Sequence, residues 1–173
     1  MKFYEICFSP TGGTKKAADM LAEKLAEEIQ SVDLTDYKTD FSGISLEEDD
    51  EAIIAVPSYG GRVPETAVKR LSLIKGNQAK AILVCVYGNR AYEDTLVELE
   101  DTAKAAGFRI TAAVAAVAEH SIARQIAAGR PDPQDQAQLT DFAEKIREKL
   151  SSGSTAEPAI PGNRAYKKAG GAG

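Results

Sequence analysis

Two almost uninterrupted apolar runs constrain the fold of this chain more than any other feature. They are AIIAVP (52–57) and AKAILVCVY (79–87). Short apolar runs of this length are typical of parallel strands that are covered on both faces of a sheet. Three further runs fit the same interpretation: KFYEIC (2–7), SVDL (31–34) and FRITAAVAAVA (108–118).

The stretches between these runs show the period of amphipathic helices. Apolar side chains recur at three and four positions from Ala17 to Ile29, and again from Ala67 to Ile74. We expect the second of these helices to begin at Pro64 and to end at Gly76. Two later helices are indicated by apolar residues at Tyr92, Leu96, Leu99, Ala103 and Ala106, closed by Gly107, and at Leu139, Phe142, Ala143, Ile146 and Leu150.

Five strands that alternate with helices predict a parallel, doubly wound α/β sheet. The exception is the segment DYKTDFSGISLEEDD (36–50), which consists of turn and acidic residues and shows no helical pattern. At 173 residues the chain has the length of one domain with a sizeable core.

Charge and cysteine content exclude several classes of function. The formal net charge of −5 argues against a nucleic-acid-binding protein, which needs a basic face. Cys7 and Cys85 both lie in apolar runs, so we expect buried thiols and not a disulfide or a metal pair. No apolar run approaches the ~18 residues of a membrane span, and no signal peptide is recognisable. We therefore expect a cytoplasmic protein without a membrane segment.

Three loops that contain glycine follow the first, third and fourth strands. They are SPTGGT (9–14), PSYGGRVPE (57–65) and YGNRAYED (87–94). Ligands of doubly wound sheets bind outside the carboxyl ends of the strands, where the winding changes direction. These three loops are therefore the predicted binding site.

The first loop has the chemistry of a phosphate site. Ser9, Thr11 and Thr14 offer hydroxyl donors, and Gly12 and Gly13 let the backbone turn its N–H groups inward. The helix that follows directs its positive end to the same place. The alternative is a simple turn in which Thr14 caps the helix. The motifs GxxxxGK[ST] and GxGxxG are both absent.

These residues resemble a known family. SPTGGT is similar to the FMN phosphate loop of flavodoxins, [ST]-x-T-G-x-T, and lies at the same place between strand and helix. Together with VPSYGGRVPE (56–65), VYGNRAYEDTLVELED (86–101) and IPGNRAYKK (160–168), it resembles the flavodoxin domain of flavodoxin/ferredoxin fusion proteins of anaerobes.

The resemblance implies a flavodoxin-like three-layer sandwich with helices on both faces of a five-stranded parallel sheet in the order 2-1-3-4-5. It implies an FMN-binding domain over residues 1–151 and a tail or linker over 152–173. In the fusion proteins a domain with iron–sulfur clusters follows, whereas this chain has no cysteine after Cys85. FMN is the expected cofactor, and an iron–sulfur, ferredoxin-type domain or protein is the expected partner.

The resemblance also gives the loop residues roles toward FMN. Tyr59 would stack on the isoalloxazine, and the Gly60–Gly61 peptide would rotate to present a carbonyl to the reduced ring. Tyr87 or Tyr92 would cover the second face, although Tyr92 also fits the core of its helix. The full expected FMN-binding set is Ser9, Pro10, Thr11, Gly12, Gly13, Thr14, Pro57, Ser58, Tyr59, Gly60, Gly61, Tyr87, Gly88, Asn89, Arg90, Tyr92 and Asp94.

Charged residues near these loops leave alternatives open. Arg62 and Arg90 depart from the acidic rim of flavodoxins, and a cation close to the flavin would raise its potential. Asp94 also suits the first turn of a helix. For His120, the only histidine, we favour a structural hydrogen bond over proton transfer.

The expected function is electron transfer by bound FMN, without a catalytic acid, base or nucleophile from the protein. Two alternatives remain. One is a flavodoxin-like NAD(P)H-dependent quinone reductase, and the other is a flavin-free module that binds a different phosphorylated ligand.

Overall fold

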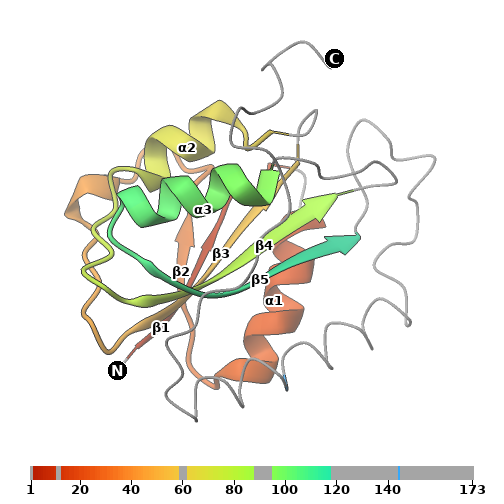
Figure 1. Cartoon of the computed structure of the whole chain (residues 1–173), viewed down its shortest axis with the longest axis horizontal. Coiled ribbons are helices and arrows are strands. Elements are labelled where there is room, and N and C mark those ends of the chain that lie inside the picture. Colours follow the sequence, from red (N-terminus) through yellow and green to blue (C-terminus); the bar gives the residue numbers. More distant parts are fainter. Residues whose placement is uncertain (1, 11–12, 59–61, 88–94, 118–143, 145–173) are drawn as a thin grey trace.

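A five-stranded parallel sheet is the centre of the computed structural model, which describes residues 2–10, 13–58, 62–87, 95–117 and 144 (Figure 1). The strand order is β2-β1-β3-β4-β5, as the family resemblance implies. All four neighbouring pairs are parallel. The strands are β1 (Phe3–Cys7), β2 (Gln30–Asp33), β3 (Glu51–Pro57), β4 (Lys80–Tyr87) and β5 (Arg109–Val117).

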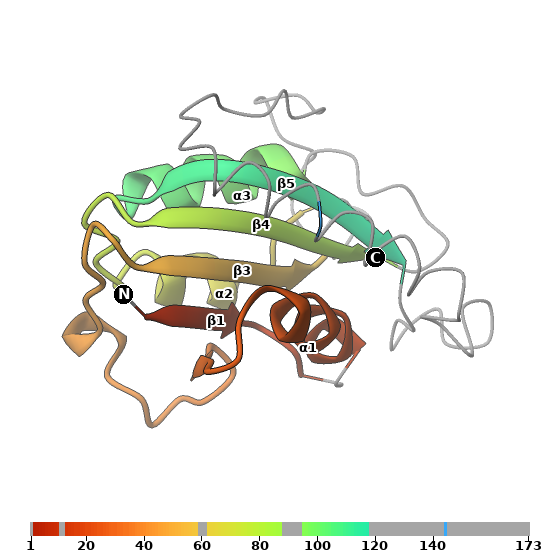
Figure 2. The ribbon, with the colours of Figure 1, turned by 90° about the horizontal axis from the view of Figure 1, so that it is seen from below.

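Helices cover both faces of the sheet, and Figure 2 shows α1 on one side and α2 and α3 on the other. The helices are α1 (Gly13–Leu25), α2 (Glu65–Leu71) and α3 (Thr95–Ala105). Alanines of α1 such as Ala18 and Ala22 are fully buried against β3 residues such as Ile53 and Ala55. On the other face Leu71 of α2 and Leu99 of α3 pack with Ile54 and Leu83. Because β3 and β4 are buried from both sides, their sequences are apolar without alternation.

The connection from β2 to β3 contains one 3₁₀ turn, Phe41–Gly43, and no α-helix, which agrees with the sequence pattern. Phe41 and Leu46 are buried in the same hydrophobic cluster as Ala67 and Leu71 of α2. Arg70 of α2 donates a hydrogen bond to the carbonyl of Leu34 and lies over the Phe41 ring, 5.9 Å from its centroid. This segment is therefore tied to α2.

The predicted end of the second helix is wrong. We expected Gly76, but α2 ends at Leu71. Lys75 pairs with the β2–β3 connection, since its N–H donates to Ile44 and its carbonyl accepts from Leu46. A residue bonded in this way cannot also continue a helix. In the first helix the apolar stripe reaches Ile29, yet α1 ends at Leu25, and Ile29 packs beyond the helix end.

Gly107 follows the end of α3, as the sequence predicts, with a φ of 99° that suits glycine. The expected last helix near 139–150, the boundary at residue 151 and the tail lie outside the described residues, apart from helical Glu144. Within the described part of the chain, no helix has the length and apolar character that crossing a bilayer requires.

Candidate functional site

The three loops predicted to form the site follow strands that are neighbours in the sheet. Cys7 at the end of β1 pairs with Ala55 of β3, and Pro57 at the end of β3 pairs with Val86 of β4. The chain therefore leaves β1, β3 and β4 at one edge, as expected for the binding edge of such a sheet.

The first loop leads directly into α1. The N–H of Lys15 donates to the hydroxyl of Ser9 over 2.9 Å, so Ser9 holds the loop against the first turn of the helix. Gly13 begins α1, and Thr14 is buried, whereas Pro10 is exposed. The first turn of α1 contains no acidic side chain. Hydroxyl groups at a helix N-terminus without an acidic side chain suit a phosphate group.

The chain that leaves β3 is bonded to α3. Pro57 ends β3, and the N–H of Ser58 donates to the carbonyl of Val86 over 3.0 Å. The hydroxyls of Ser58 and Thr95 share a hydrogen bond of 2.7 Å, and both residues are buried. Ser58 is therefore fixed to both β4 and the first residue of α3.

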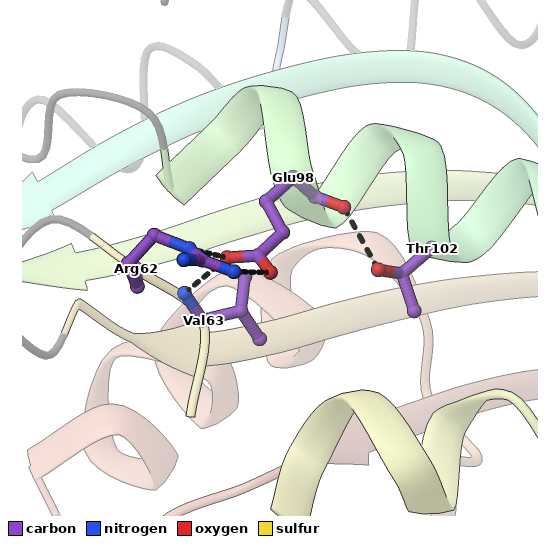
Figure 3. Close-up of polar contacts among 4 residues, drawn as sticks. All are labelled: Arg62, Val63, Glu98 and Thr102. Atoms are coloured by element: carbon purple, nitrogen blue, oxygen red, sulfur yellow. Dashed lines mark hydrogen bonds and ion pairs between the residues drawn. The ribbon is translucent and has the colours of Figure 1, made fainter. Parts of the chain in front are cut away.

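A carboxylate that the sequence analysis missed receives three hydrogen bonds (Figure 3). Glu98 of α3 accepts from Arg62 Nε at 2.8 Å and from Arg62 Nη2 at 2.7 Å, and it also accepts from the N–H of Val63 at 2.8 Å. Glu98 is 6% exposed. We refer to Arg62, Val63 and Glu98 as the Glu98 network. Its two-pronged ion pair compensates the charge of Arg62 next to the site.

The remaining predicted site residues are only partly described. Tyr87 ends β4, where its backbone pairs with Val117 of β5. The residues outside the described part of the chain are Thr11, Gly12, Tyr59, Gly60, Gly61, Gly88, Asn89, Arg90, Tyr92, Asp94 and His120.

A buried acidic side chain lies beneath the start of α1. Glu5 of β1 is 3% exposed, and Lys15 Nζ lies 3.6 Å from its Oε2. Burial, followed by the hydrogen bond and negative charge of Asp19, raises the pKa of Glu5 to about 8. Lys15 opposes this shift and also donates to Asp19 over 2.9 Å. Glu5 is therefore mostly protonated at neutral pH.

The thiols are buried and unpaired, as the sequence predicts. Burial raises the pKa of both, to about 12 for Cys7, so neither is a thiolate at neutral pH. Among the described residues, no group of three histidine, cysteine or acidic side chains could hold a metal ion.

A five-stranded parallel sheet in the order 2-1-3-4-5 with helices on both faces defines the flavodoxin-like class of α/β proteins. The sequence profile described as Flavodoxin matches residues 6–144, and the chain belongs to this family. FMN is the cofactor that this membership implies. The hydroxyl groups of Ser9 and Thr14 and the acid-free first turn of α1 fit its phosphate.

Solved structures with the same fold include two bacterial flavodoxins. The flavodoxin of Streptococcus pneumonia TIGR4 is 23% identical, with a TM-score of 0.56, and the match covers 85% of this chain and 99% of that one. Flavodoxin 1 of Bacillus cereus is 19% identical, with a TM-score of 0.63 and coverages of 86% and 98%.

A longer protein contains the fold as one part. Rubredoxin oxygen:oxidoreductase from the anaerobe Desulfovibrio gigas is 17% identical, with a TM-score of 0.59, and the match covers 87% of this chain but 36% of that one. A search of curated protein sequences found no match.

Proposed function

We propose that this protein is an electron carrier that binds FMN at the carboxyl edge of β1, β3 and β4 and exchanges electrons with an iron–sulfur partner. The observation that supports it best is the start of α1, where Ser9 and Thr14 stand at an acid-free helix N-terminus on that edge. Bound FMN supplies one-electron chemistry, and the protein binds the phosphate, positions the ring and excludes water.

FMN binding is tested by adding FMN and, separately, riboflavin to the flavin-free protein while fluorescence is followed. We expect FMN to bind much more tightly than riboflavin, because only FMN has the phosphate. Stepwise anaerobic reduction should then show a stable one-electron-reduced form in the visible spectrum. Absence of binding at micromolar FMN would refute the proposal.

The phosphate site is tested with Thr14→Val, which removes a buried hydroxyl and keeps the shape of the side chain. A hydrogen bond to a charged group contributes about 1.5–3 kcal/mol, so FMN binding should weaken roughly 10- to 100-fold. Riboflavin binding should not change. The matched control is Thr66→Val, at an exposed position of α2, which should alter neither affinity.

The iron–sulfur partner is proposed from the resemblance to fusion proteins and from the fold's occurrence within a longer oxidoreductase. Rapid mixing of the FMN-loaded protein with a reduced ferredoxin-type protein should reduce the flavin. Steady-state consumption of NAD(P)H with a quinone acceptor, in the absence of any other protein, would instead favour a reductase.

A further inference from the structure

The residues on both sides of 59–61 are bonded to the same turn of α3. Ser58, just before this segment, shares a 2.7 Å hydrogen bond with Thr95. Arg62 and Val63, just after it, donate to Glu98 over 2.7–2.8 Å. Thr95 and Glu98 are three residues apart, which places them on one side of the helix.

The bonds to Glu98 fix both a side chain and the backbone. The guanidinium of Arg62 binds both carboxylate oxygens, and the N–H of Val63 binds one of them. The Glu98 side chain is 8% exposed and that of Arg62 is 22% exposed, so water screens this ion pair only weakly. The carboxylate therefore determines where the backbone lies at Val63.

The same turn of α3 also follows residues 88–94 directly in the sequence. The first turn of α3 is thus joined by hydrogen bonds to one predicted flavin loop and by covalent bonds to the other. The position of the chain at Arg62 and Val63, next to the second predicted flavin loop, therefore depends on α3. If the FMN affinity contributed by that loop differs between redox states, the difference depends on how firmly this position is held.

We propose that Glu98 is a positioning residue that sets the two one-electron potentials of bound FMN by fixing the chain at Arg62 and Val63 to α3. The inference rests on the proposed function. A change in FMN affinity that differs between redox states shifts the potentials, whereas an equal change in every state does not.

Charge must be separated from position, because a lone cation or anion beside the flavin would also shift its potential. Arg62→Lys keeps the positive charge but loses the planar, two-pronged contact. The double variant Arg62→Gln/Glu98→Gln removes one positive and one negative charge, so the net charge of the protein is unchanged. The matched control is Glu100→Gln, another buried glutamate of α3, whose Oε2 lies 3.6 Å from Lys104 of the same helix.

The experiment measures both one-electron potentials of the FMN-loaded proteins by anaerobic equilibrium reduction with reference dyes. In both charge-conserving variants we expect the difference between the two one-electron potentials to change by about 60 mV or more. A change of this size is a tenfold change in the ratio of the affinities of the protein for two redox states of FMN. Glu100→Gln should resemble the wild type. Faster hydrogen exchange at the Val63 amide of the flavin-free variants should accompany the shift.

Each other outcome is informative. Potentials that equal those of the wild type in both variants overturn the inference and leave the proposed function intact. A wild type that does not bind FMN overturns both. If the double variant does not fold, as judged by circular dichroism, Arg62→Lys alone decides the question.

Discussion

Glu5 stands out at the scale of single residues, because its Oε1 is buried without a hydrogen-bond partner among the described residues. Its pKa is about 8 in the folded protein, against an ordinary value of 4.5. Below pH 4.5 the carboxyl is protonated in both states, and its full contribution to stability is present. Between these values the unfolded chain loses the proton that the folded protein keeps, so stability falls as pH rises.

We therefore predict that Glu5→Gln reduces the loss of stability between pH 5 and pH 9. One pKa unit corresponds to about 1.4 kcal/mol, so the variant should be more stable than the wild type at pH 9, by an amount on the order of a few kcal/mol. Urea unfolding of the flavin-free protein across this pH range gives the measurement. Glu23→Gln, at an exposed position of α1, is the control. Parallel stability curves for Glu5→Gln and the wild type would contradict the prediction.

The Glu98 network shows what a sequence does not reveal about a single residue. Arg62 and Val63 were visible as part of a loop, but their partner is 35 or 36 residues away, and nothing local indicates the pairing. TLVELED (95–101) gives no such signal either, because three apolar residues in seven are ordinary for a helix with one exposed face. Residues 95–100 are in fact all buried. A glutamate in such a helix needs a partner.

At the scale of elements, the turns before β4 and β5 meet at the amino edge of the sheet. The N–H of Gly76 donates to the carbonyl of Ala106, and a Cβ on Gly76 would come within 2.8 Å of the Gly107 backbone. We predict that Gly76→Ala lowers the free energy of unfolding by about 1–3 kcal/mol, because the backbone of one turn must shift.

The measurement is urea unfolding, with Gly43→Ala as the control. A Cβ on Gly43 would lie 3.7 Å from its nearest neighbour, Asp40 Oδ2, which is an ordinary contact. That control should change stability by no more than about 0.5 kcal/mol. Neither variant should alter FMN affinity, since neither residue adjoins the predicted FMN loops. Equal free energies of unfolding for the two variants would contradict the prediction, because they would show that the two turns can move apart without loss of stability.

Element types were predictable because they depend on local patterns, whereas some element ends were not. The apolar runs gave β3 and β4 to within a residue, since strands buried on both faces need apolar side chains throughout. The end of α2 was missed because the bonds of Lys75 to Ile44 and Leu46 join segments about 30 residues apart. Such bonds override the helical period of the sequence.

At the scale of the whole molecule, the two thiols report on complete unfolding. Cys7 and Cys85 lie in β1 and β4, between layers of helices, and are 5% and 0% exposed. A thiol reagent reaches them only when the sheet opens. We predict that the thiols of the native protein react only slowly at pH 8, whereas both thiols react at once in denaturant. The chromophore that the thiol reagent releases measures the reaction.

The variant Cys85→Ala leaves one thiol, so it assigns the reaction to one strand. Cys7 should then react at a rate set by the opening of the fold, and more slowly in any variant of greater stability. Rapid reaction of one equivalent with the native wild type would contradict this prediction.

The position of β1 inside the sheet has a consequence for synthesis on the ribosome. The chain emerges amino end first, so β1, α1 and β2 can pair once Asp33 has emerged. The other edge of β1 pairs only after β3 has been synthesised. Strands β4 and β5 then pair with the sheet in the order in which they are translated. Glu98 becomes available only with α3. We therefore expect the predicted phosphate loop to form early on a nascent chain, while the cofactor is retained only after α3 has emerged.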